Sequence, residues 1–306
     1  MNKHEKTKQR TLKASISLTG KGLHSGLPVT ITLRPAVENY GYVFRRIDLP
    51  DAPTIKCHAE NVVSTDRSTT LSSNGVTVST VEHCMAALYA CGIDNCLIDI
   101  NNSELPILDG SSAEYVHKIK QVNTIRQTAD REYFTPKNIL EYSDGYARLT
   151  LIPDNQFSIE LDINFKSPIL GKQYVQLNSL SEFADKFSPC RTFVFIKEIQ
   201  ELLQRGLIKG GCLNNAIVIY DEQIKQEELN AIADTMSVER QSAEKLGYIL
   251  SRPLLFPNEP AGHKLLDLIG DLALTGHFIN GKIIAHCPGH RVNNMFARTL
   301  IHEITA

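Results

Sequence analysis

The order of the predicted elements is repeated along the chain, and this repeat constrains the fold more than any single motif. In the first part, alternating apolar and polar residues predict strands, and these cover 11–20, 27–35, 40–49 and 69–80, the last with a hairpin turn at Asn74-Gly75. A helix, a strand, a loop and a second helix follow, at 79–92, 95–100, 101–110 and 112–120. The first part is therefore a strand-rich segment that ends in two helices.

A second segment repeats this order. Two alternating strands flank a Pro-Asp-Asn turn within 145–165. Near the end of the chain, a helix over 263–276 is followed by a strand at 280–287 and a final helix from Asn293. We infer an internal duplication. The expected fold class is α+β, with two duplicated two-layer α/β sandwich domains and the active site at their interface.

The boundary between the two domains is placed in the polar stretch from Val122 to Thr135. It gives an N-terminal domain over 1–127 and a C-terminal domain over 128–306, and a length of 306 residues suits two domains of ordinary size.

The C-terminal domain carries additional sequence at about 194–221, where the pattern predicts a βαβ-like insert. A helical apolar stripe runs along it at Ile196, Ile199, Leu202 and Leu203. Such a stripe usually packs into the core of its own domain. It would also suit the wall of a site for a hydrophobic substrate.

Composition excludes several classes of protein. A formal net charge of −2 without a long basic run argues against a nucleic-acid partner. No apolar run reaches the roughly 18 to 20 residues of a membrane span, and no hydrophobic signal core follows the charged segment 1–10. The seven cysteines include no Cys-x-x-Cys pair, which favours reduced thiols. We expect a cytoplasmic monomer with no transmembrane segment.

Three polar residues recur four positions apart on the C-terminal helix, namely His263, Asp267 and Asp271. On an α-helix they form one ridge, and an imidazole and a carboxylate one turn apart can hold a divalent cation. The opposite arc of this helix is apolar, so the ridge would equally suit a solvated helix face. The residues alone leave both interpretations open.

Glu82 and His83 lie at the start of the corresponding helix in the first half. Ser79 and Glu82 have the spacing of a capping box, which would give Glu82 a purely structural role. If the duplication brings the two helices together, His83, His263 and Asp267 supply the two imidazoles and one carboxylate of a catalytic zinc site.

Three further residues would then take part in proton transfer. Glu82, next to a ligand, would be the general base for water that zinc activates. A leaving amine needs a proton donor, and His290 on the Pro288-Gly289 turn would supply the proton, oriented and charged by Asp271. The pattern predicts a hydrolase that cleaves amides.

Six stretches of the sequence resemble the motifs of one known family. They are GLHSG, STVEHCMAAL, ELPILDGSSAEYV, RTFVF, GHKLLDLIGDLALTG and PGHRVNN. The family comprises UDP-3-O-acyl-N-acetylglucosamine deacetylases, zinc amidases of lipopolysaccharide synthesis. They release acetate from UDP-3-O-(3-hydroxyacyl)-N-acetylglucosamine in the committed step of lipid A biosynthesis. The family has two similar α/β halves with the active site between them, which agrees with the inferred duplication.

The resemblance implies roles for the matched residues. It implies a Zn²⁺ site at His83, His263 and Asp267, which would also suit Fe²⁺ in the cell. It implies catalytic roles for Glu82, His290, Asp271, Thr192 and Lys264. Of these, Thr192 would steady the oxyanion and Lys264 would contact the polar part of the substrate.

The resemblance further implies that five residues line the sugar and acyl sites, namely Leu23, His24, Phe193, Gly211 and Leu213. The insert then becomes the expected passage for the hydroxyacyl chain.

The sequence departs from the family pattern at two places. Gly262 precedes His263 where many relatives carry arginine, and we expect this to loosen a loop or alter phosphate contacts. Residues 165–174 replace a more frequent His-Pro form. In some lineages the family is fused to a hydroxyacyl dehydratase, whereas this chain ends at Ala306, so we expect a stand-alone enzyme or an excised domain.

Two other functions fit some of these residues. A zinc amidase for another N-acylated sugar or peptide would need no continuous apolar passage at 194–221. A non-catalytic binding protein on the same scaffold would use Glu82 as a helix cap, but it leaves the convergence of four polar segments unexplained.

Overall fold

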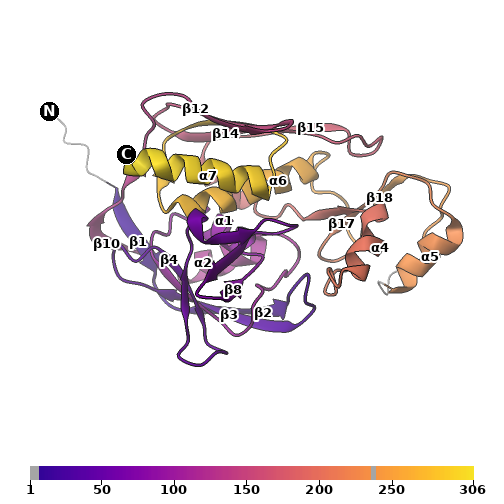
Figure 1. Ribbon diagram of the computed structural model, residues 1–306, viewed down its shortest axis with the longest axis horizontal. Coiled ribbons are helices and arrows are strands. Elements are labelled where there is room, and N and C mark those ends of the chain that lie inside the picture. The colour runs from indigo at the N-terminus through magenta and orange to yellow at the C-terminus, as the bar shows by residue number, and fades with distance from the viewer. Residues whose placement is uncertain (1–6, 236–238) are drawn as a thin grey trace.

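The computed structural model describes residues 7–235 and 239–306, without the side chains of Gln200, Leu203 and Thr235 (Figure 1). Residues 1–6 of the charged N-terminal segment and the Leu203 side chain of the predicted stripe therefore lie outside the described part. Helices and strands are both abundant, which confirms the α+β class.

Two five-stranded sheets with the same topology form the outer layers of the fold. In spatial order, the first consists of β2 (Ile16–Lys21), β3 (Pro28–Pro35), β9 (Cys96–Ile100), β4 (Tyr42–Arg46) and β5 (Thr54–Lys56). The second consists of β12 (Leu140–Asp144), β13 (Ala147–Ile152), β20 (Gly281–His286), β14 (Phe157–Asn164) and β15 (Lys172–Leu177).

The middle strands establish the duplication. β9 runs antiparallel to β3 and parallel to β4, and β20 likewise runs antiparallel to β13 and parallel to β14. β20 therefore separates two strands that follow each other along the chain. The same order and the same directions in both sheets confirm the duplication inferred from the sequence.

Two pairs of helices fill the space between the sheets. They are α1 (Glu82–Ala90) and α2 (Ala113–Val122) from the first half, and α6 (Glu259–Leu272) and α7 (His290–Thr305) from the second. Figure 1 shows them between the two sheets, with α1 next to α6. One continuous apolar core joins both halves, with Leu88 of α1 and Leu268 of α6 fully buried in it. Among the described residues, no helix has the length and apolar character needed to cross a bilayer.

Short strands form smaller sheets beside the two large ones. β1 (Lys8–Leu12) pairs with β10 (Thr124–Asp130), and β11 (Tyr133–Phe134) pairs with β19 (Phe278–Ile279). A small sheet contains β6 (Val62–Ser64), β7 (Thr70–Ser73) and β8 (Val76–Val78), and a short helix α3 covers Phe183–Lys186. The predicted boundary at 127/128 falls inside β10, whose polar sequence forms a strand because β1 supplies backbone partners. The division into domains at that point stays a prediction.

The insert is larger than the stretch 194–221. β16 (Phe193–Phe195), α4 (Ile196–Gln204) and β17 (Ile217–Tyr220) form a βαβ unit with parallel strands. α5 (Gln226–Thr235) and β18 (Gly247–Ile249) extend it, and β18 pairs antiparallel with β17. Figure 1 shows the insert projecting from one end of the layers. Its apolar side chains form a separate core, made of Ile196, Ile199, Leu202, Ile208, Val218, Tyr220, Leu229 and Ile232.

The predicted capping box at the start of α1 is wrong. Ser79 bonds to Ser103 instead, through both its backbone N–H and its hydroxyl. Thr80 has a positive φ of 58°, so the chain turns sharply before the helix begins at Glu82. The carboxylate of Glu82 is therefore not a cap and is free to take part in other contacts.

Two other helices start earlier than the sequence pattern predicts. α6 begins at Glu259 with Pro260 in its first turn, so His263 lies in the second turn. α7 begins at His290 rather than at Asn293, so His290 is a helical residue and not part of a turn. The predicted end of α6 is close to the observed one, because a 3₁₀ turn follows it and stops at Gly276, which has a φ of 73°.

Gly262 lies inside α6, so the expectation that it loosens a loop is wrong. A Cβ at this position would lie 2.6 Å from Sγ of Cys190 and 3.0 Å from the ring of Phe256. Packing around the start of α6 therefore leaves no room for a side chain here.

α1 and α6 approach closely because the residue at their crossing is glycine. A Cβ on Gly270 would lie 2.1 Å from the carbonyl oxygen of Glu82 and 2.8 Å from its carbonyl carbon. Backbone atoms cannot move aside as a flexible side chain can, so any side chain at this position would push the helices apart.

We predict that Gly270→Ala lowers the free energy of unfolding by about 1–3 kcal/mol, the usual cost of overpacking a core. Urea denaturation measures this change. Gly247→Ala is the control, because a Cβ there would meet no atom within 4 Å. Equal stability of the two variants would show that α1 and α6 can separate without cost.

Candidate active site

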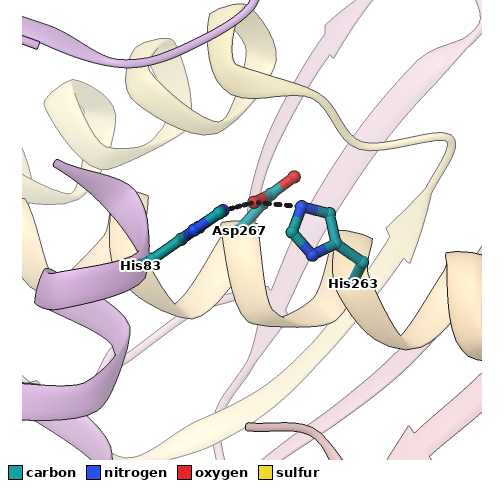
Figure 2. A group of neighbouring side chains, drawn as sticks. All are labelled: His83, His263 and Asp267. Carbon is teal, nitrogen blue, oxygen red and sulfur yellow. Dashed lines mark ion pairs between the residues drawn. The ribbon is translucent and has the colours of Figure 1, made fainter. Parts of the chain in front are cut away.

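Three side chains converge where α1 and α6 cross. His83 is the second residue of α1, and His263 and Asp267 lie one turn apart on α6 (Figure 2). Oδ1 of Asp267 lies 3.3 Å from Nε2 of His263 and 3.8 Å from Nε2 of His83. The imidazole rings are nearly perpendicular, at 87°, with centroids 5.1 Å apart. All three residues are buried, and their possible ligand atoms lie within 4.8 Å of one another.

The hydrogen bonds and protonation of these side chains suit a metal. Nδ1 of His263 lies 3.0 Å from the carbonyl oxygen of Cys190 and donates a hydrogen bond to it. Nε2 of the neutral ring therefore carries a free electron pair. Burial lowers the pKa of both histidines, that of His83 to about 3. Burial opposes ionisation of Asp267, but His263 and Lys264 hold its pKa well below its usual range.

One atom shows the fit most directly. Oδ1 of Asp267 is buried and has no hydrogen-bond partner among the described residues, although it faces two neutral imidazole nitrogens. A buried anionic oxygen without a donor is costly unless a cation satisfies it. The three residues therefore form a candidate metal site whose donor set suits a divalent transition metal.

Glu82 turns its carboxylate toward the same pocket. Oε2 accepts a hydrogen bond of 3.0 Å from the backbone N–H of Thr69, and Oε1 lies 3.9 Å from Nε2 of His290. Burial raises the pKa of Glu82 to about 7, although His290 opposes this rise. A carboxyl group with such a pKa can accept and release a proton near neutral pH.

His290 is held by Asp271, which is fully buried. Nδ1 of His290 lies 2.9 Å from Oδ2 of Asp271, and its Nε2 lies 3.9 Å from Oδ2 of Asp267. Burial alone would lower the pKa of His290, but Asp271 and Asp267 raise it to about 9. His290 is therefore a cation near neutral pH, with its Nε2 proton directed to the pocket.

Two buried residues that the sequence analysis did not select complete this network. Oγ1 of Thr69 donates to Oδ1 of Asp271 at 2.6 Å, and Nδ2 of Asn293 donates to Oδ2 of Asp271 at 2.9 Å. Asn293 lies one turn after His290 on α7, so helical spacing could have found it. Thr69 lies just before β7, and no periodicity marks it.

Lys264 and Thr192 lie beside the candidate metal site. Nζ of Lys264 donates to Oδ2 of Asp267 at 2.9 Å and lies 5.5 Å from the ring centroid of Phe193. Thr192 lines the same pocket, and its backbone N–H donates to the carbonyl of Gly110 at 2.8 Å. That bond ties the wall of the pocket to the first half of the molecule.

An apolar pocket in the insert adjoins the pocket that contains the candidate metal site. Leu23, Arg67, Thr192 and Phe193 line both. The five residues expected at the sugar and acyl sites all line the apolar pocket, namely Leu23, His24, Phe193, Gly211 and Leu213. The described members of the predicted stripe, Ile196, Ile199 and Leu202, do so too. The stripe is thus both the core of the insert and the wall of a cavity.

Close backbone contacts join the insert to the first half. The N–H of Gly210 donates to the carbonyl of Leu23 at 2.9 Å, and a Cβ on Gly210 would lie 2.2 Å from the carbonyl oxygen of Gly22. Arg67 forms a bidentate ion pair with Glu198 of α4, with its shorter contact at 2.8 Å. The residues that line both pockets therefore come from both halves of the chain.

The family can now be assigned. The sequence profile of the UDP-3-O-acyl N-acetylglycosamine deacetylase family matches residues 9–237 and 242–302. The chain belongs to this family. Its members are hydrolases that act on an amide C–N bond, and the match confirms the resemblance carried by the six motifs.

Individual deacetylase relatives cover the chain almost completely. The chain is 51% identical over 306 residues to the protein named bifunctional enzyme LpxC/FabZ of Bacteroides thetaiotaomicron. The matched region covers 98% of this chain and 66% of that protein. The namesake of Porphyromonas gingivalis is 50% identical over 299 residues, with 97% and 65% covered. The UDP-3-O-acyl-N-acetylglucosamine deacetylase of Geotalea uraniireducens is 40% identical over 294 residues, with 96% and 88% covered. The chain thus spans just under two thirds of the length of the two bifunctional relatives.

A buried ion pair fixes the start of α6. Arg191 and Glu259 are both fully buried, with Nε and Oε1 2.8 Å apart and Nη2 and Oε2 3.0 Å apart. Burial alone would raise the pKa of Glu259, but Arg191 and the backbone N–H of Leu255 lower it below its usual value.

We predict that Glu259→Gln lowers the free energy of unfolding by about 3–5 kcal/mol, because it leaves Arg191 buried without its counter-charge. Since the pKa of Glu259 is lower in the folded state, its ionisation stabilises the fold above the unfolded pKa. This stability is lost as the pH falls through the folded value. Between pH 7 and about pH 3, the wild type should therefore lose more stability than the variant in urea titrations.

The matched control is Glu160→Gln, which removes a half-exposed pair with Lys282 and should cost no more than about 1 kcal/mol. A Glu259→Gln variant with the stability and acid sensitivity of the wild type would contradict the role given to the buried pair.

Proposed function

We propose that this chain is a zinc-dependent amidohydrolase that removes the N-acetyl group of UDP-3-O-(3-hydroxyacyl)-N-acetylglucosamine and releases acetate in lipid A biosynthesis. One observation carries the proposal. A buried two-histidine, one-carboxylate set meets Glu82 and His290 in a pocket that adjoins an apolar one. The names of the relatives supply the substrate.

The chain's own residues divide the chemistry. His83, His263 and Asp267 would hold zinc, and the bound ion would act as a Lewis acid that lowers the pKa of water and polarises a carbonyl. Glu82 takes a proton from the attacking water through Oε1, which is the oxygen not bonded to Thr69.

His290 acts on the carbonyl oxygen and on the leaving amine. Its Nε2–H stabilises negative charge on the carbonyl oxygen and then gives its proton to the leaving amine as the C–N bond breaks. Asp271 keeps the imidazole charged and oriented. Oε1 of Glu82 and Nε2 of His290 lie 3.9 Å apart. The proton that Glu82 takes from water can therefore pass to His290 and recharge it for the next cycle.

The two pockets accept different parts of the substrate. The apolar pocket accepts the hydroxyacyl chain, Thr192 assists at the oxyanion, and Lys264 contacts the polar part of the sugar nucleotide. Both ring nitrogens of His24 are buried without partners among the described residues, which suits a hydroxyl or ester oxygen at the chain's entrance. A zinc amidase for a sugar or peptide without a lipid chain is the alternative, and the apolar pocket argues against it.

We further infer that zinc is the metal, with Fe²⁺ as an alternative that the same donors accept. A monomer suffices, because residues of one chain supply the whole proposed constellation. A cytoplasmic location is supported by the UDP-linked substrate and by seven cysteines that are all free.

Glu82→Gln tests the mechanism. The variant should bind zinc as the wild type does but release acetate from the UDP-linked substrate about 10²- to 10⁴-fold more slowly, because the amide cannot accept a proton. Glu114→Gln on the exposed face of α2 is the control. Full activity in Glu82→Gln, or a purified wild type without metal, would refute this mechanism.

Ala233→Phe tests the lipid passage. Ala233 lies on α5 and lines the apolar pocket, so a phenyl ring there would fill space assigned to the acyl chain. KM for a long-chain substrate should rise roughly tenfold or more, while KM for a short-chain analogue stays near that of the wild type. Ala233→Ser is the control of similar size. An equal effect on both substrates would place the acyl chain elsewhere.

A further inference from the structure

We propose that Thr69 is a positioning residue that fixes the catalytic base and the catalytic acid together. The proposal deepens the function proposed above and rests on it. Thr69 is fully buried, lies between the two groups, and is not one of the metal-binding residues. Its backbone and its side chain have separate tasks.

The backbone of Thr69 orients the base. Its N–H donates to Oε2 of Glu82 at 3.0 Å, which leaves Oε1 directed to the pocket and to His290. Its carbonyl accepts from the N–H of Val81, the residue before α1, at 3.4 Å. Thr69 is thus hydrogen-bonded to Glu82 and to the residue before it, Val81.

The hydroxyl of Thr69 orients the acid. An ionised carboxylate only accepts hydrogen bonds, so the hydroxyl proton goes to Oδ1 of Asp271, 2.6 Å away. Oγ1 of Thr69 also lies 3.3 Å from Nδ1 of His290 and can accept a hydrogen bond from it, beside the 2.9 Å bond from Nδ1 to Oδ2 of Asp271. The Nδ1 proton of His290 is therefore held on the side away from the pocket, and Nε2 faces the substrate.

The loop before Thr69 is anchored to the insert. Arg67 pairs with Glu198 at 2.8 Å, and Asp66 pairs with Arg205, both on or just after α4. Thr69 is therefore positioned by the acyl-binding insert on one side and by α1 on the other. A shift of this loop would move the base and the acid together.

Thr69→Val tests the role, because it keeps the backbone N–H and the side-chain volume but removes the hydroxyl. We expect kcat for the UDP-linked substrate to fall about 10- to 100-fold, with KM and zinc content nearly unchanged. Thr69→Ser should restore most of kcat. Thr70→Val is the control, since in the described part of the chain its hydroxyl bonds to none of Glu82, Asp271 and His290.

A double-mutant cycle separates positioning from general damage. If Thr69 acts through Asp271, then Thr69→Val should lower kcat less than about twofold in an Asp271→Asn background. A loss of the same size in both backgrounds would overturn the proposal. So would a Thr69→Ser variant that is as slow as Thr69→Val, or a Thr69→Val variant with wild-type kcat.

Proton NMR of the zinc-loaded protein provides a readout that does not depend on turnover. The hydrogen-bonded Nδ1–H of His290, assigned by its loss in His290→Asn, should give a downfield signal in the wild type and in Thr69→Ser. In Thr69→Val it should be displaced or lost, and an unchanged signal would overturn the proposal. A wild type that binds zinc and shows this signal but releases no acetate would refute the proposed function alone. If Thr69→Val and Thr69→Ala both fail to fold, the residue belongs to the core and the proposal fails.

Discussion

The contact between the backbones of α1 and α6 at Gly270 is the constraint on which the rest of the site depends. Neither half of the molecule contains the complete candidate metal site, because His83 lies on one helix and His263 and Asp267 lie on the other. The duplicated sheets place these helices face to face, and glycine allows them to touch. The site is thus a property of the interface, and it forms only when both halves have folded.

Burial acts on every titratable group in this interface, and it decides the pKa shifts of His83, His263 and Glu82, whereas neighbouring charges reverse its effect on His290. Two histidines stay neutral, Glu82 has its pKa raised to about 7, and His290 has its pKa raised to about 9. The difference between the histidines follows from their partners. His290 has the fully buried carboxylate of Asp271 on its far nitrogen, whereas His263 has the carbonyl of Cys190 there. One pocket therefore contains neutral imidazoles that can donate an electron pair and an imidazolium that can donate a proton.

Sequence patterns could predict the parts of this structure that are local. Alternation and helical spacing were sufficient for the repeated order of elements and for the ridge that contains His263 and Asp267. Glu82 was ambiguous because the residue spacing of a capping box says nothing about where Ser79 finds its partner, and that partner is Ser103 in another segment. Thr69 could not be found, since its bond to Asp271 joins positions 202 residues apart and follows no period. The extent of the insert was also missed, because α5 and β18 lie beyond the apolar stripe that marked it.

The insert has a core of its own, and this has an evolutionary consequence. Substitutions among Val218, Leu229 and Ile232 change the shape of the apolar cavity and the packing of the insert. They do not touch the crossing of α1 and α6, because the core of the insert is separate from the one that joins the two halves. Selection can therefore reshape the apolar cavity, the proposed acyl site, while the crossing of α1 and α6 stays the same.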